Sequence, residues 1–198
     1  MAVYNVLRFL FRLLFLTVFR WKVEGEENIP AYGGAIIAPN HISLWDPPLM
    51  GAALSRRIHF MAKEELFSYP VFSWIITQLK AFPVKRGAAD RNAIRTAVTL
   101  LEQGELVGLF PEGTRGRNGI LGPAEPGVLM IAVKANVPII PVAIIGTNQV
   151  GRFPILFPRF IVRFGKPLTV PQGKLSREET EVQGRLVMAE IAALLGRQ

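Results

Sequence analysis

A short segment, NHISLWD at residues 40–46, places a histidine and a carboxylate five positions apart. If the chain turns here, Asp46 can hydrogen-bond the imidazole of His41, fix its tautomer and stabilise the imidazolium that forms when the ring accepts a proton. The pair is therefore a candidate general base. The alternative is structural, because Asp46 before Pro47 fits a helix N-cap and Ser43 stands at capping-box spacing from it.

A second segment, FPEGTR at residues 110–115, places an arginine after a loop that proline and glycine make tight. Such a loop can expose backbone N–H groups, and the guanidinium of Arg115 can bind a phosphate through two parallel hydrogen bonds. Lys63 and Arg86, each just past a predicted strand, are further candidates for contacts with an anion. The alternative for all three side chains is a surface loop in which water solvates them.

Several other kinds of site are excluded by residues that the sequence lacks. The chain has no cysteine, which excludes disulfides, cysteine-ligated metals and a thiol nucleophile. The G-x-S-x-G pattern of serine hydrolases and the H-E-x-x-H pattern of zinc hydrolases are also absent. A histidine general base must be His41 or His59, because the chain has only 2 histidines.

The balance of charge and apolar residues indicates the class of partner. The formal net charge of +8 implies an anionic partner, which is a nucleic acid, a lipid surface or a phosphorylated substrate. No aromatic RNA-binding motif, zinc finger or run of five basic residues is present, so we expect no nucleic acid. Half of the residues are hydrophobic, which favours a membrane surface.

The elements that must position these residues alternate along the chain. Strands are predicted at residues 34–39, 58–62, 81–84, 105–110, 138–145 and 159–164, and helices at 47–54, 71–80, 90–103, 126–136 and 176–195. Runs such as AIIAP are apolar on both sides of the pleat, which is typical of strands covered on both faces. We expect an α/β fold with a single mixed, largely parallel sheet covered by helices, and chemistry at the carboxyl ends of its strands.

The first residues predict an amphipathic helix. At about 100° per residue, four polar side chains fall within an arc of roughly 120° and the rest is apolar; they are Asn5, Arg8, Arg12 and Arg20. The arginines interrupt the apolar run, which disfavours a spanning helix. We expect residues 1–22 to form an interfacial membrane helix on anionic lipid, ahead of a catalytic domain at 23–198. The alternative is a helix that packs on that domain.

The segments, in order and spacing, resemble the four motifs of the glycerolipid acyltransferases. The matching segments are NHISLWD at 40–46, FPVKR at 82–86, FPEGTR at 110–115 and VPIIPVAI at 137–144. The resemblance implies transfer of a fatty acyl group from acyl-CoA or acyl carrier protein to the free hydroxyl of 1-acylglycerol 3-phosphate (lysophosphatidate). The product would be phosphatidate, formed without an acyl-enzyme, a metal or a cofactor. The resemblance also implies association with the membrane, which we place at its cytoplasmic face.

The same resemblance assigns roles to individual residues. It makes His41 the general base and Asp46 the residue that orients it. The implied contacts with the acceptor and its phosphate are Lys63, Arg86, Glu112, Gly113, Thr114 and Arg115. Other acceptors, glycerol 3-phosphate or another lysolipid, remain open. The sequence lacks the motifs of a lipid hydrolase. A non-catalytic lipid-binding module needs only basic and apolar surfaces. Replacement of His41 distinguishes such a module, which should keep its function, from an acyltransferase, which should not.

Overall fold

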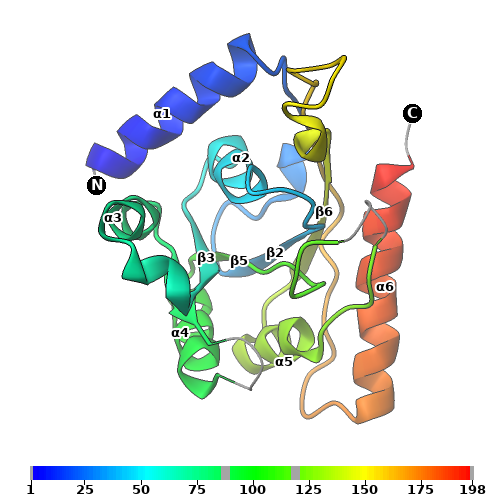
Figure 1. Ribbon diagram of the computed structural model, residues 1–198. Helices are drawn as coiled ribbons and strands as arrows, with labels where there is room; N and C mark the ends of the chain where they lie inside the picture. Colours follow the sequence, from blue (N-terminus) through cyan, green and yellow to red (C-terminus); the bar gives the residue numbers. More distant parts are fainter. Residues whose placement is uncertain (1, 86–89, 117–120, 197–198) are drawn as a thin grey trace.

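The centre of the molecule is one seven-stranded sheet with the strand order β1-β7-β6-β2-β5-β3-β4 (Figure 1). The computed structural model describes residues 2–85, 90–116 and 121–196. The strands are β1 (Lys22–Glu24), β2 (Ala35–Pro39), β3 (Ile58–Lys63), β4 (Phe82–Val84), β5 (Leu106–Gly108), β6 (Ile139–Ile145) and β7 (Ile161–Phe164). Only the pairing of β6 with β7 is antiparallel, so the predicted single mixed, largely parallel sheet is confirmed.

Helices cover both faces of the sheet. They are α1 (Ala2–Thr17), α2 (Asp46–Ala53), α3 (Pro70–Gln78), α4 (Arg91–Glu102), α5 (Pro126–Ala135) and α6 (Arg177–Leu195). One apolar core joins α1 and α2 to the sheet, and a second joins α4, α5 and α6 to its other face (Figure 1). Both faces of β2 are buried, as the AIIAP run predicted.

The predicted elements from residue 34 onward are present, with ends that differ by at most 2 residues. The capping box at Ser176 and Glu179 forms as the sequence predicted, and Asp90 caps α4 through the N–H groups of Asn92 and Ala93. Strand β1 was not predicted. Its three residues are too few to show a period, and its partner β7 lies far along the chain.

Helix α1 is shorter than expected and its arginines face the protein. It ends at Thr17, and Arg20 lies beyond it with a positive φ of 44°. The guanidinium of Arg8 donates to the carbonyl of Ser55 at 2.8 Å, and that of Arg12 donates to the carbonyl of Ala52 at 2.8 Å. The expectation that these arginines face anionic lipid is therefore wrong, because they bind the free carbonyl groups where α2 ends.

The outer face of α1 is apolar instead. Its exposed large apolar side chains are Val6, Phe9, Leu10, Leu13 and Leu16, and the polar Asn5 and Thr17 are exposed near its two ends. The opposite face of the same helix carries Phe15, which is fully buried in the core with Phe19. The alternative interpretation, a helix that packs on the domain, is confirmed, whereas the interfacial membrane helix stays a prediction. Among the helices that the structure describes, none has the length and apolar character needed to cross a bilayer.

Candidate active site

His41 and Asp46 form a buried hydrogen-bonded pair where β2 ends and α2 begins. The imidazole Nδ1 lies 2.8 Å from Oδ2 of Asp46, and the carboxylate is fully buried. Because a carboxylate only accepts hydrogen bonds, Nδ1 carries the proton and Nε2 is left with its lone pair. The predicted contact between these two side chains is present, and the tautomer that it selects suits a general base.

The carboxylate of Asp46 is held by more than the histidine. Its Oδ2 also accepts from the backbone N–H groups of Ile42 and Ser43, each at 2.7 Å. The alternative interpretation of Asp46 as an N-cap is wrong, since Asp46 is the first residue of α2 and Trp45 occupies the cap position without a side-chain cap. The aspartate thus orders the loop that carries His41, and does not cap the helix that follows it.

Thr147 is a member of the site that sequence reasoning missed. Its hydroxyl donates to Oδ1 of Asp46 at 2.6 Å, and the residue is buried. It opens the short 3-10 helix η4 (Thr147–Gln149), directly after β6, which neighbours β2 in the sheet. The signal available was only its position just past the fourth motif, at the carboxyl end of a predicted strand.

Residues 110–116 hydrogen-bond both backbone groups of His41, its N–H and its carbonyl. The His41 N–H donates to Oε1 of Glu112 at 3.0 Å, and the His41 carbonyl accepts from the N–H of Gly116 at 2.8 Å. The other carboxylate oxygen of Glu112 accepts from the N–H of Gly122 at 3.1 Å. Glu112 therefore holds the backbone of His41, the candidate base, and its predicted contact with the acceptor stays a prediction.

The ring of Phe110 stacks on the imidazole of His41. Their centroids lie 3.9 Å apart and the rings are inclined by 23°. Phe60 stacks in turn behind Phe110, where Gly108 leaves room, because a Cβ there would meet the Phe60 ring at 2.2 Å. The aromatic face of Phe110 beside the imidazole restricts the orientation of the His41 ring. The motif pattern gave Phe110 no role, so the sequence missed this contact as well.

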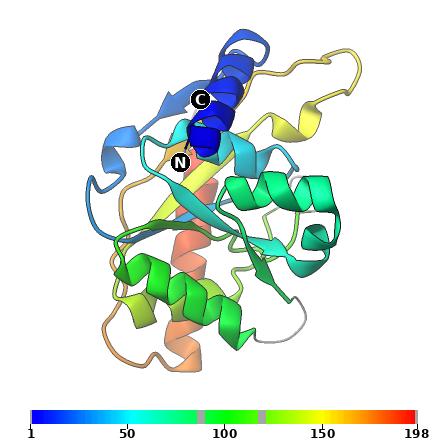
Figure 2. The same ribbon diagram turned by 90° about the vertical axis from the view of Figure 1, so that its left-hand side faces the viewer.

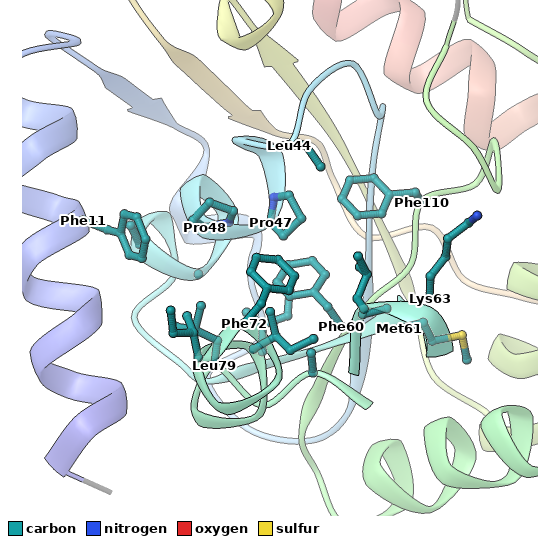
Figure 3. Close-up of a pocket in the computed structure, with 18 of the residues that line it drawn as sticks. Phe11, Leu44, Pro47, Pro48, Phe60, Met61, Lys63, Phe72, Leu79 and Phe110 are labelled. Carbon is teal, nitrogen blue, oxygen red and sulfur yellow. The ribbon is translucent and has the colours of Figure 1, made fainter. Parts of the chain in front are cut away.

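His41 lines an apolar pocket of about 370 Å³. Its walls come from α1, α2, α3 and β3, and the labelled side chains in Figure 3 run from Phe11 and Leu79 at one end to Phe110 and Lys63 at the other. The charged or titratable side chains at this pocket are Tyr4, Arg8, His41, Lys63 and Arg115. The candidate base, three cations and apolar walls therefore share one cavity.

The remaining predicted residues lie apart from that cavity or outside the described chain. Gly113 and Thr114 line a second pocket of about 670 Å³, and Phe110 borders both pockets. Gly113 has a positive φ of 66°, which the tight turn after Pro111 requires. Arg86 lies outside the residues that the structure describes, so its predicted contact with phosphate stays a prediction.

His59 is not part of the pair. It lies on β3 with its Nε2 3.8 Å from a carboxylate oxygen of Glu105. Burial lowers the pKa of His59, and the attraction of Glu105 partly opposes that shift. Among the described residues that line the apolar pocket, His41 is the one histidine, and it is therefore the candidate base.

Comparison with known proteins places these residues in a family. A family model described as Acyltransferase matches residues 20–145. The 1-acyl-sn-glycerol-3-phosphate acyltransferase of Bacillus subtilis is 37% identical over 129 residues, which are 65% of this chain and 64% of that protein. The protein of the same name from Streptococcus pneumoniae is 30% identical over 80% of this chain and 62% of its own length. The alignments thus span less than two thirds of either relative.

A solved structure resembles nearly the whole fold. The crystal structure of the 1-acyl-sn-glycerophosphate acyltransferase PlsC from Thermotoga maritima superposes with a TM-score of 0.75. The two chains are 30% identical, and the match covers 98% of this chain and 81% of the other. The family match spans well over half of the chain and includes both loops that hold His41. This protein therefore belongs to the acyltransferase family.

Proposed function

We propose that this protein transfers a fatty acyl group from acyl-CoA or acyl carrier protein to the free hydroxyl of lysophosphatidate, giving phosphatidate. The observation that carries the proposal is His41, held by Asp46 and Phe110 at an apolar pocket that Lys63 and Arg115 also line. The names of the Bacillus and Streptococcus relatives and of the Thermotoga structure support this acceptor. Glycerol 3-phosphate and other lysolipids are the alternative acceptors.

The chemistry requires one base and no enzyme nucleophile. Nε2 of His41 takes the proton of the acceptor hydroxyl as its oxygen attacks the thioester carbonyl carbon. The new C–O bond of the ester forms, the C–S bond breaks, and the thiolate leaves and recovers a proton from the imidazolium or from water. Asp46 stabilises the positive charge that His41 carries between these events.

The two kinds of wall in the pocket suit the two parts of an amphiphilic acceptor. The apolar side chains can take up a hydrocarbon chain, because burial of each methylene group contributes about 0.8 kcal/mol. Lys63 and Arg115, which line the pocket together with His41, then bind the phosphate. In this arrangement Glu112 acts through the backbone of His41, while Gly113 and Thr114 shape the loop around it.

We also propose that α1 rests in the cytoplasmic surface of the membrane. Its five exposed apolar side chains would enter the boundary between headgroups and acyl chains, while its inner face stays packed on the domain. Since Arg8 and Arg12 bind carbonyl groups of the protein, apolar burial supplies most of this affinity. The helix also contributes Phe11 to the pocket wall, so in the proposed placement the pocket would adjoin the lipid phase.

The proposal is tested with the purified protein, both acyl carriers and a panel of acceptors, with products identified by mass spectrometry. We expect phosphatidate from lysophosphatidate, and a loss of about a hundredfold or more in turnover for His41→Ala. His59→Ala is the matched control and should retain turnover, since His59 lies outside the pocket. A His41→Ala protein that keeps its turnover would exclude the general-base mechanism, and a protein that binds lipid without forming any ester would be a binding module.

A further inference from the structure

The segment at residues 151–157 exposes four large apolar side chains. It runs GRFPILF between η4 and β7. The side chain of Phe153 is 92% exposed, and the other three are 53–55% exposed: Ile155, Leu156 and Phe157. A soluble surface rarely gathers so much apolar area in one short loop without a partner. This loop is also not used by the proposed mechanism, although it follows Thr147 directly.

The exposure is a property of a folded loop. The N–H of Gly151 donates to the carbonyl of Leu156 at 3.1 Å, and the N–H of Arg152 donates to the carbonyl of Gln149 at 3.1 Å. Arg152 and Ile155 also form an isolated antiparallel bridge. Because these bonds satisfy backbone groups at the base of the loop, the loop can enter an apolar phase at a lower cost than an open chain would.

The loop lies beside the carboxyl end of α1. The rings of Phe157 and Phe19 meet edge to face with centroids 6.0 Å apart, and Arg20 donates to the carbonyl of Phe157 at 3.4 Å. Figures 1 and 2 both show the yellow loop next to the last turn of the blue helix. The exposed apolar side chains of the loop therefore adjoin the segment that carries the apolar outer face of α1.

The charged side chains around residues 151–157 indicate what kind of surface this loop can bind. Two exposed arginines flank the apolar residues, Arg152 on one side and Arg159 on the other. The sequence has no aspartate or glutamate from residue 126 to residue 177, so no acidic side chain of this segment opposes them. An apolar tip between two cations is complementary to a bilayer with anionic headgroups, where each basic side chain near the surface adds attraction.

We infer that residues 151–157 are a second membrane contact, which inserts its apolar tip into an anionic bilayer beside α1 while Arg152 and Arg159 meet lipid phosphates. The inference rests on the proposed placement of the enzyme at a bilayer. One helix alone leaves the domain free to rotate about the helix axis. A second contact at the end of α1 removes that freedom and fixes how the pocket wall that α1 contributes is presented to the lipid phase.

The test compares two leucines of similar exposure. Leu156 in the loop is 53% exposed, and Leu186 on α6 is 50% exposed (α6 in Figure 1). We expect Leu156→Glu and Phe153→Glu to weaken binding to vesicles of phosphatidylcholine and phosphatidylglycerol about tenfold or more, the scale of losing one buried apolar side chain. Leu186→Glu should bind like the wild-type protein, because α6 covers the other face of the sheet.

Further measurements separate this inference from misfolding and from the proposed function. Each variant should melt like the wild type and keep its turnover in detergent micelles, so that only vesicle binding changes. A Phe153→Trp variant should show a blue-shifted emission, quenched by brominated lipids, when vesicles are added. Equal vesicle binding by the loop variants and Leu186→Glu would overturn the inference, as would a dimer in solution that Phe153→Glu dissociates. Absence of acyl transfer by the wild-type protein would instead contradict the proposed function, while the comparison of vesicle binding would still test the second membrane contact.

Discussion

Replacement of Asp46 by asparagine separates the charge of this side chain from its hydrogen bonds. The carboxylate accepts four hydrogen bonds, three at Oδ2 and one at Oδ1 from Thr147. An asparagine oxygen at the Oδ2 position can keep the first three acceptor contacts. Its Nδ2 then faces the Thr147 hydroxyl, which can turn and accept. We therefore expect Asp46→Asn to fold with little loss of stability and to keep the tautomer of His41.

Asp46→Asn should instead lower turnover. Two unit charges at the 2.8 Å separation of His41 Nδ1 and Asp46 Oδ2 attract by about 6 kcal/mol at an effective dielectric constant of about 20. Asparagine retains a neutral hydrogen bond to the ring, so only part of that attraction is lost as the imidazolium forms. A hydrogen bond to a charged group contributes about 1.5–3 kcal/mol, so we expect kcat to fall by about 10- to 150-fold.

The assay measures kcat with saturating lysophosphatidate and acyl donor, next to thermal melting of the same preparation. Asp46→Ala is the contrasting variant, because it removes all four acceptor contacts and should lower both the melting temperature and kcat. Wild-type turnover in a folded Asp46→Asn protein would refute the role of the carboxylate charge. A large drop in its melting temperature would show that Nδ2 does not find the Thr147 hydroxyl.

Three other predictions follow from the contacts around the site. Arg115→Ala and Lys63→Ala should raise the KM of lysophosphatidate more than that of the acyl donor, and equal changes in steady-state kinetics would contradict phosphate binding. Glu112→Gln replaces one hydrogen-bond-accepting oxygen by an N–H donor and should lower kcat without changing the KM of lysophosphatidate. A raised KM would instead support the predicted contact of Glu112 with lysophosphatidate. Burial lowers the pKa of His59 in the folded protein, so the unfolded chain binds a proton more readily as the pH falls below about 6.5. The free energy of unfolding therefore decreases on acidification. In urea titrations, His59→Gln should lose less stability on acidification than the wild type does.

The contact between His41 and Asp46 could be predicted from the sequence because it is local. His41 and Asp46 are five positions apart on one turn, so their types and spacing already indicate the contact that the structure contains. Thr147 reaches the same carboxylate from 101 positions away, and no local pattern marks it. Glu112 shows the same limit, since its motif was visible but its bond to the backbone of His41 depends on the pairing of β2 with β5.

The orientation of α1 shows what periodicity leaves open. The sequence correctly indicated that Arg8 and Arg12 share one face of a helix, but a helical period does not say which face turns toward the protein. Their partners are carbonyl groups at the end of α2, and such acceptors exist only once α2 has formed and docked. Part of the apolar face is therefore exposed and part is packed in the core, its contact with a membrane stays a prediction, and Arg8 and Arg12 bind the protein.

The placement of Tyr4, Arg8 and Phe11 in the pocket wall affects how this protein should be trimmed for study. Removing an amphipathic first helix is a common way to obtain a soluble form of an enzyme. Here that cut would also open one side of the apolar pocket and expose core residues that pack against Phe15. A shortened chain that loses activity would then say nothing about lipid attachment. Polar replacements limited to Phe9, Leu13 and Leu16 change the outer surface and leave the pocket intact.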